Sequence, residues 1–126
     1  MGRYGKMKET VPDRRPAIFV DLDGCIVIHN YNADTTPDIV IADSMEKLLQ
    51  WRKNNYYIVL TTGRPKKHVK RILKIFKNEY GFCFDYIITN LPVGKRILIN
   101  DTSSSGEIRS FSFAPERNVG VGAISL

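Results

Sequence analysis

The 126-residue chain contains only two cysteines, Cys25 and Cys83, and they lie far apart in the sequence. So few thiols exclude a disulfide framework or a cysteine-based metal cluster and favour a reducing, cytoplasmic compartment. No apolar run approaches the roughly 20 residues of a membrane helix, so we expect no membrane association. Residues 1–16 are polar and basic and lack the apolar stretch of a secretory signal. We predict a flexible segment over 1–16 and a single domain over 17–126.

The chain carries an excess of positive charge. It has 19 Lys and Arg against 13 Asp and Glu, which gives a formal net charge of +6 at pH 7. A basic protein attracts anions such as phosphorylated metabolites, nucleic acid or acidic surfaces, and charge alone does not choose among them. The hydrophobic fraction of 43% is ordinary for a globular domain and excludes a disordered chain.

One stretch near the start of the domain has a distinctive pattern. Residues 17–24 read Ala-Ile-Phe-Val-Asp-Leu-Asp-Gly, which predicts a strand buried on both faces and ending in two carboxylates. Alternation along a strand sends Asp21 and Asp23 to the same face. Two such carboxylates repel each other unless a cation or a proton lies between them. The alternative interpretation of Asp-x-Asp-Gly is a simple turn, since these residues are common in turns.

The rest of the chain alternates between strand and helix patterns. We predict helices over 45–53 and 66–80 and strands over 56–60, 84–89, 97–99, 107–113 and 119–124. The fold class is therefore α/β, as a three-layer sandwich with a Rossmann-like, mainly parallel sheet. We also expect a small flap over 25–32 and a C-terminal β-hairpin.

Polar residues follow three of the predicted strands, at positions where parallel strands would meet at one edge of the sheet. Together these are Asp21 and Asp23, Thr61 to Arg64, and Asn100 with Asp101. Carboxylates from two strands, with hydroxyls and a glycine, are typical of a site for a divalent cation and a phosphoryl group. Cys25 next to the acids is the weaker candidate for a nucleophile, because no histidine has a suitable spacing to activate it.

The same three segments resemble the motifs of the haloacid dehalogenase-like hydrolases, most of which are Mg²⁺-dependent phosphatases. Residues 19–24 (Phe-Val-Asp-Leu-Asp-Gly) resemble the first motif of that family and residues 60–65 (Leu-Thr-Thr-Gly-Arg-Pro) the second. Residues 97–101 (Ile-Leu-Ile-Asn-Asp) are similar to the fourth. Each motif is short, but the ordered set spans most of the chain and is specific.

The resemblance implies a role for each of the residues that match. Asp21 would be the nucleophile that forms an aspartyl-phosphate, and Asp23 the general acid and base. Asp21, Asp23 (through its backbone carbonyl) and Asp101 would hold Mg²⁺. The residues implied for binding the phosphoryl group are Thr62, with Thr61 as the alternative if the register is one residue off, together with Gly63 and Arg64.

The sequence departs from the family pattern in two places. The lysine of the third motif is missing at its usual position, which Leu91 occupies, so Lys95 is our candidate and Arg96 its alternative. Asn100 replaces one acid of the fourth motif, which implies either weaker Mg²⁺ binding or a different set of residues around the Mg²⁺ ligands. A weak or inactive member of the family is therefore an open alternative.

The short segments between the motifs leave no room for a cap domain, so the site is open. We expect a phosphorylated small molecule as substrate, such as a sugar phosphate, with a large substrate or closure by a second subunit in a homo-oligomer as alternatives. A basic helix face over 66–77 supports another alternative, a phosphate- or nucleic-acid-binding module without activity. A polynucleotide 3′-phosphatase would combine the open site with that face.

Overall fold

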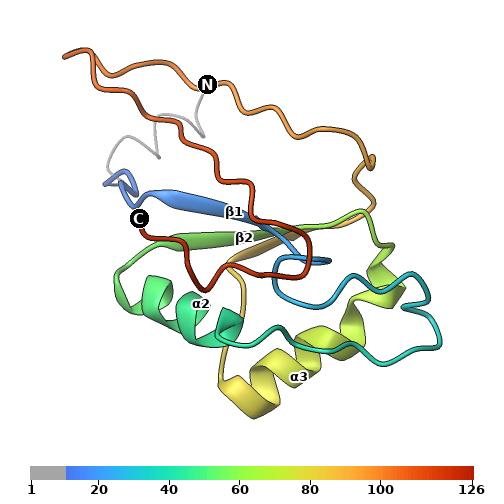
Figure 1. Ribbon diagram of the computed structural model, residues 1–126. Coiled ribbons are helices and arrows are strands. Elements are labelled where there is room, and N and C mark those ends of the chain that lie inside the picture. The colour runs from blue at the N-terminus through green and yellow to red at the C-terminus, as the bar shows by residue number, and fades with distance from the viewer. Residues whose placement is uncertain (1–10) are drawn as a thin grey trace, which may run out of the picture.

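The computed structural model describes residues 11–126, so most of the segment predicted to be flexible, 1–16, lies outside the described residues. The regular elements, in chain order, are β1 (Ala17–Asp21), α2 (Ser44–Lys53), β2 (Tyr57–Thr61), the short 3₁₀ helix η1 (Lys66–His68), α3 (Lys70–Tyr80) and β3 (Tyr86–Ile88). The strands form a sheet in the order β1-β2-β3 (Figure 1). Residues 11–126 therefore form a small α/β domain with a three-stranded parallel sheet and two α-helices, which confirms the predicted class.

The register of the sheet places two predicted site residues side by side. β1 and β2 are parallel, and Asp21 is the partner of Thr61. β2 and β3 are also parallel, and Thr61 is in turn the partner of Ile88. Because the three strands run the same way, their carboxyl ends meet at one edge of the sheet, as the sequence predicts.

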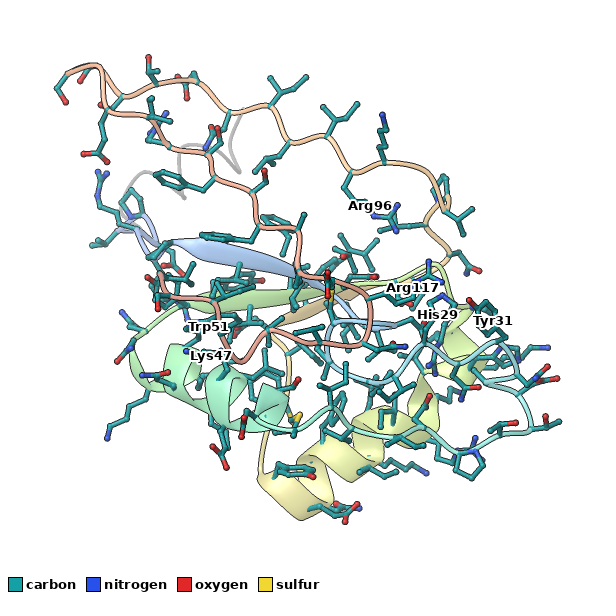
Figure 2. All side chains as sticks on the ribbon, in the orientation of Figure 1. His29, Tyr31, Lys47, Trp51, Arg96 and Arg117 are labelled. Atoms are coloured by element: carbon teal, nitrogen blue, oxygen red, sulfur yellow. The ribbon has the colours of Figure 1, made fainter. Side chains whose placement is uncertain are left out.

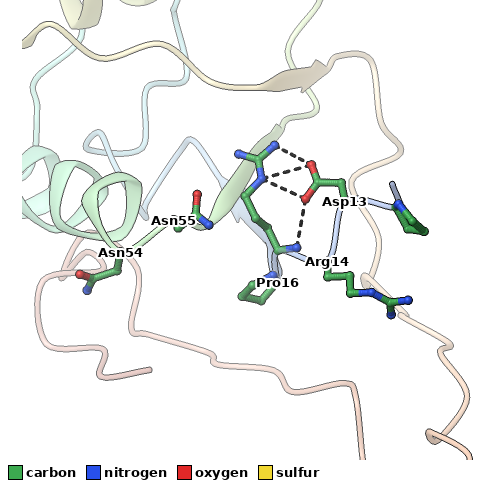
Figure 3. Close-up of a pocket in the computed structure, with 7 residues that line it drawn as sticks. Asp13, Arg14, Pro16, Asn54 and Asn55 are labelled. Carbon is green, nitrogen blue, oxygen red and sulfur yellow. Dashed lines mark hydrogen bonds and ion pairs between the residues drawn. The ribbon is translucent and has the colours of Figure 1, made fainter. Parts of the chain in front are cut away.

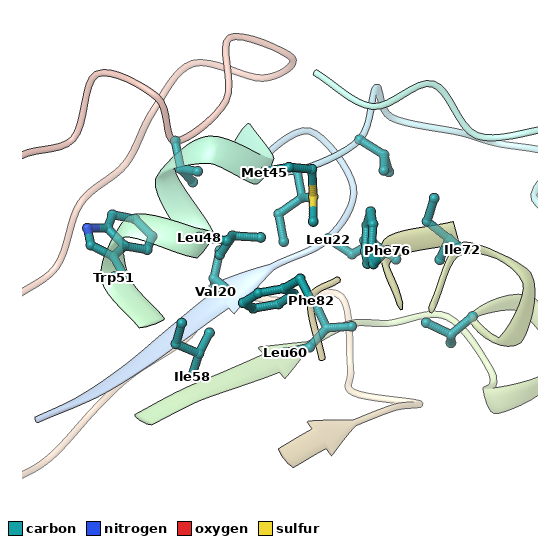
Figure 4. Close-up of a cluster of buried hydrophobic side chains, with 14 residues drawn as sticks. Val20, Leu22, Met45, Leu48, Trp51, Ile58, Leu60, Ile72, Phe76 and Phe82 are labelled. Carbon is teal, nitrogen blue, oxygen red and sulfur yellow. The ribbon is translucent and has the colours of Figure 1, made fainter. Parts of the chain in front are cut away.

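Both helices lie on the same face of the sheet (Figure 1). Right-handed connections between neighbouring strands added in one direction place the helices on one side. The prediction of a three-layer sandwich is therefore wrong for residues 11–126, which have one helical layer. Between this layer and the sheet lies a buried cluster that includes Val20, Leu22, Met45, Leu48, Trp51, Ile58, Leu60, Ile72, Phe76 and Phe82 (Figure 4).

The helix predicted over 66–80 consists of two pieces. Its first turn is η1, in which His68 N–H donates to Pro65 O (2.9 Å) and Val69 N–H donates to Lys66 O (3.1 Å). These bonds span three residues, so this turn is wound more tightly than an α-helix. α3 then continues to Tyr80 and ends at Gly81, whose φ of 67° is in the left-handed region that glycine adopts readily.

A small flap follows β1, as predicted, although its arms extend beyond the expected residues. Ile28 N–H donates to Ile39 O (2.8 Å), and Ile41 N–H donates to Ile26 O (2.9 Å). The two arms are joined by an isolated antiparallel bridge between Val27 and Val40 rather than by a continuous ladder. The flap therefore folds back across the carboxyl end of β1 and brings residues 30–38 toward the site.

The strands predicted over 97–99, 107–113 and 119–124 are wrong, because residues 89–126 contain no strand. The expected C-terminal hairpin keeps its turn, where Ser103 N–H donates to Glu107 O (2.9 Å), and contacts of Arg109 with Asn100 and Asp101, but it forms no ladder. Beyond the turn the two arms diverge (Figure 1). Apolar alternation gives this segment strand propensity, but a two-stranded ribbon that packs on nothing is marginal in water, and Ile97, Ile99 and Phe111 are exposed.

The last residues return to the domain and pack against the flap. Val121 is buried in the main cluster. Gly120 has a φ of 88°, and a Cβ atom built on it would lie 2.7 Å from Cγ2 of Ile41. The chain end therefore rests closely on the residues that lead from the flap into α2. Among residues 11–126, no helix has the length and apolar character needed to cross a membrane.

Candidate functional site

Asp21 is the last residue of β1 and lies at the carboxyl edge of the sheet. Burial raises the pKa of its carboxyl above the ordinary value; a hydrogen bond from the Leu22 backbone opposes this effect, and the nearby Asp23 carboxylate adds to it. The positive charge of Arg96 and the His29 ring act on the same carboxyl in the opposite direction. Asp21 is thus a half-buried acid whose ionised form is disfavoured by its surroundings and favoured by added positive charge.

Asp23 lies in a buried ion cluster centred on Arg64. Arg64 Nε donates to Asp23 Oδ2 (2.9 Å) and Nη2 donates to Asp23 Oδ1 (2.7 Å). Two further bonds join Arg64 to Asp38, from Nη2 to Oδ1 (2.6 Å) and from Nη1 to Oδ2 (3.0 Å). The side chains of Arg64 and Asp38 are only 6% and 3% exposed. The cluster ties the flap to the loop that follows β2.

The guanidinium of Arg64 has no donor left for a substrate. A fifth bond runs from Nη1 to the backbone oxygen of His68 (3.0 Å), so all five N–H groups have partners. Burial opposes the charge of Arg64, but the bonds to Asp23 and Asp38 outweigh it and raise its pKa. The arrangement therefore gives Arg64 a positioning role, holding Asp23 beside Asp21, rather than contact with a phosphoryl group.

The two threonines of the predicted phosphoryl site differ in accessibility. Thr62 is fully buried, and its Oγ1 accepts the backbone N–H of Arg64 (3.1 Å). Thr61 is half-buried, faces Asp21 in the register and donates its hydroxyl to Val20 O (3.3 Å). Gly63 has little room for a side chain, because a Cβ atom would lie 3.3 Å from Leu91 O. Thr61 is therefore the hydroxyl level with Asp21, and Thr62 orders the loop that carries Arg64.

The structure does not bring Asp101 into the group with Asp21 and Asp23. Its side chain is 79% exposed and is ion-paired with Arg109. Within residues 11–126, no three His, Cys, Asp or Glu side chains are grouped so that they could hold a metal ion. Asp21 and Asp23 are the two acids of the predicted set that lie together. As arranged, the residues therefore do not fit the Mg²⁺ site that the family resemblance implies.

Lys95 and Arg96 follow one another on the loop after β3, and the two differ in their surroundings. Lys95 is exposed, whereas Arg96 Nη1 donates to the backbone oxygens of Pro92 (2.6 Å) and Gly94 (2.9 Å). The charge of Arg96 acts on the Asp21 carboxyl, as noted above. Of the two candidates for the missing lysine of the third motif, Lys95 and its alternative Arg96, it is Arg96 whose charge lowers the pKa of Asp21.

Sequence reasoning missed a second cluster at this end of the molecule. Arg117 Nη1 donates to the hydroxyl of Tyr31 (2.8 Å), and the rings of Tyr31 and His29 lie 4.3 Å apart between centroids. Figure 2 labels these residues on the same side of the molecule as Arg96. Arg117 follows Tyr31 by 86 residues, and no local motif marks either of them, so the cluster could not be found from spacing.

Cys25 does not have the properties of a reactive thiol. Burial and the neighbouring Asp21 carboxylate raise its pKa from 9.0 to about 11. A thiol in such a place is almost entirely protonated at neutral pH and is a poor nucleophile.

A separate hollow of about 600 Å³ lies away from the candidate site (Figure 3). Its lining comes from residues 12–16, which precede β1, and from Asn54 and Asn55, which precede β2. It therefore lies at the amino end of the strands. An ion pair between Arg15 and Asp13 (2.7 Å) forms part of its wall, and the hollow is open and shallow compared with a ligand pocket.

Comparisons of the chain with protein-family models, with curated proteins and with solved structures gave no match. The functional interpretation consequently depends on the three sequence motifs and on the geometry described above.

Proposed function

We propose that this chain is a phosphomonoester hydrolase of the haloacid dehalogenase-like type, acting on a phosphorylated small molecule in the cytoplasm. The domain would be an abbreviated Rossmann-like fold with an open, capless site. The observation that carries the proposal is the position of Asp21. It ends β1 next to Thr61, at the edge of a parallel sheet where ligands bind in α/β proteins, and the positive charge of Arg96 favours the ionised form of its carboxyl.

The proposed reaction has two steps. A carboxylate oxygen of Asp21 attacks phosphorus, and the bond from phosphorus to the leaving oxygen breaks while that oxygen takes up a proton. Water then attacks the aspartyl-phosphate, which releases inorganic phosphate and restores the Asp21 carboxylate. Asp23 is the proposed proton donor and acceptor. Oδ2 of Asp23 accepts one hydrogen bond, from Arg64, and has a second lone pair that can take up the proton.

The nucleophile assignment is tested by turnover of p-nitrophenyl phosphate. We expect Asp21→Asn to lower kcat by about a thousandfold or more, since the attacking oxygen anion is lost. Glu79→Gln is the matched control, because Glu79 is an exposed acid at the far end of α3 and its substitution should leave kcat unchanged. Equal turnover by wild type and Asp21→Asn would overturn the proposal.

The need for Mg²⁺, which the family resemblance implies, is tested separately. The described residues supply two neighbouring acids and not three, so no reaction step is assigned to the cation. Turnover is measured after chelation and after addition of Mg²⁺. Activity that is lost on chelation and restored by Mg²⁺ supports the cation as a cofactor, and activity that does not respond excludes it.

One observation favours the second candidate function, a binding module without catalysis. The basic side chains of η1 and α3 are all exposed; they are Lys66, Lys67, Lys70, Arg71, Lys74 and Lys77. Such a face can follow a phosphate backbone, and its affinity should fall steeply with added salt. Salt-dependent binding to DNA or RNA, with no turnover of phosphorylated metabolites, would favour this function over the hydrolase.

A further inference from the structure

We propose that Arg117, held by Tyr31 above the loop that follows Asp21, binds a second anionic group on the leaving group of the substrate. The preferred substrates would then be phosphomonoesters that also carry a carboxylate or another phosphate. This inference rests on the proposed function, because that function places the reacting phosphoryl group at Asp21.

Arg117 is anchored to the loop that carries the two acids. Asn118 N–H donates to Gly24 O (2.9 Å), and the Asn118 side-chain oxygen accepts the backbone N–H of His29 (2.7 Å). A Cβ atom added to Gly24 would lie 3.2 Å from Cγ of Arg117, so the stem of this side chain passes directly over Gly24. The stem of Arg117 is therefore fixed over Gly24, which follows Asp21 by three residues in the chain.

The charge of Arg117 is available for a ligand. Its one side-chain partner among the described residues is the neutral hydroxyl of Tyr31, and none of the ion pairs formed by residues 11–126 includes Arg117. Arg64, by contrast, is neutralised by Asp23 and Asp38 and has no donor left. A guanidinium with free N–H groups binds carboxylate or phosphate through two parallel hydrogen bonds.

A second positive charge supports the same assignment. Arg96 lies at the same end of the molecule as Arg117 (Figure 2) and carries no carboxylate partner among the described residues. Two bonds to backbone oxygens use only its Nη1, which leaves Nε and Nη2 free. A substrate with a single phosphoryl group, held at Asp21, would leave Arg117 without an anion.

The experiment compares ligands that differ in one carboxylate, by calorimetric binding to the full chain. The pairs are 3-phosphoglycerate with glycerol 3-phosphate, and 6-phosphogluconate with glucitol 6-phosphate, so that two spans between the anions are covered. We expect the ligand with the carboxylate to bind about tenfold more tightly in at least one pair, as one charge-assisted contact would give. Equal affinities in both pairs would overturn the inference.

Three variants assign the preference to Arg117. In Arg117→Met the tenfold ratio should fall to about one, and in Tyr31→Phe, which keeps the ring and removes only the hydroxyl, it should fall part of the way. Lys53→Met is the control, because it removes the same charge at the end of α2, which leads into the amino end of β2. A full ratio retained in Arg117→Met would overturn the inference.

The outcome is independent of the test of the hydrolase. An Arg117-dependent ratio without any turnover would leave the anion site in place and remove the proposed reaction. Turnover that depends on Asp21, with no such ratio, would remove the anion site alone.

Discussion

Arg64 and Asp38 are joined by two hydrogen bonds, of 2.6 Å from Nη2 to Oδ1 and of 3.0 Å from Nη1 to Oδ2. Arg64 comes from the loop after β2 and Asp38 from the flap after β1, so this contact fixes the flap over the edge of the sheet. Burial opposes the charge of Asp38, but hydrogen bonds from Arg64 and Asn30 outweigh it and lower the pKa of the carboxyl. Both partners are therefore charged at neutral pH and buried.

Removing one partner of this cluster should be costly. We expect Arg64→Met to lower the free energy of unfolding by about 3–5 kcal/mol at pH 7, because Asp23 and Asp38 are left as buried carboxylates without a counter-charge. The measurement is urea unfolding followed by circular dichroism.

The control for this prediction is an exposed pair of the same type. Arg15 forms an ion pair with Asp13 at the surface, and Arg15→Met should leave the unfolding free energy nearly unchanged. If Arg64→Met were as mild as Arg15→Met, the cluster would contribute nothing to holding the flap.

The raised pKa of Asp21 predicts that the candidate nucleophile destabilises the fold when it is ionised. A carboxyl whose pKa is higher in the folded than in the unfolded chain lowers stability above the ordinary Asp value of 3.8 and has no such effect below it. Asp21→Asn, which cannot ionise, should thus be more stable than wild type at neutral pH, and the difference should grow as the pH rises above about 4 until Asp21 is ionised in the folded protein. Urea unfolding over that range provides the measurement.

The same variant should lose activity while it gains stability, as expected for a catalytic group whose charge its surroundings disfavour. A variant Asp21→Asn that is less stable than wild type at pH 7 would mean that the carboxylate makes favourable contacts that the fold requires. Glu79→Gln, an exposed acid on α3, should show no comparable trend with pH.

The positions of Asp21 and Thr61 could be predicted from the sequence, because both residues end strands of the parallel sheet. Asp21 and Thr61 each follow an apolar run, and two parallel strands with that pattern must end at the same edge. The partners of Arg64 could not be predicted, because Asp38 lies in a turn-rich stretch 26 residues away and nothing local distinguishes it from any loop acid.

In the C-terminal third of the chain, the apolar pattern predicts strands that the structure does not contain. The apolar residues of 97–99 have the propensity of a buried strand, but in the structure they are exposed and make no ladder. Propensity describes how a segment fits a sheet that is already there and does not supply the neighbouring strand. The expectation that Asp101 lies close to Asp21 required a strand over 97–99 in the same sheet. Because that strand does not form, the expectation fails, and residues 97–101 alone gave no sign of this.

The two cysteines should differ strongly in reactivity. Burial raises the pKa of the Cys25 thiol to about 11, so it holds little thiolate at about pH 8, and Cys25 should react far more slowly than the exposed Cys83 with a disulfide reagent. Cys83→Ser should leave only the slow phase, and Cys25→Ser only the fast one. Because the Asp21 carboxylate contributes to the raised pKa, Asp21→Asn should accelerate the slow phase. Equal rates for both thiols in the native protein would contradict the enclosed position of Cys25.

Two glycines with left-handed backbone should respond differently to alanine. Gly81 has a φ of 67° and no atom within 4 Å of an added Cβ, so Gly81→Ala should lower the unfolding free energy by about 1–2 kcal/mol from backbone strain alone. Gly120 has a φ of 88°, and its added Cβ would collide with Cγ2 of Ile41 at 2.7 Å, so Gly120→Ala should lose about 1–3 kcal/mol more. Urea unfolding of both variants gives the comparison.

The contact with Ile41 also predicts that the stability lost in Gly120→Ala depends on the side chain at position 41. Truncation in Ile41→Ala removes the methyl group that the new Cβ would strike, so the double variant should be more stable than the sum of the two single losses predicts. Additive losses, or equal losses for Gly81→Ala and Gly120→Ala, would show that the chain end does not press on the residues between the flap and α2. Since the same chain end carries Arg117, its close seating on Ile41 also helps to fix the stem of that side chain over Gly24.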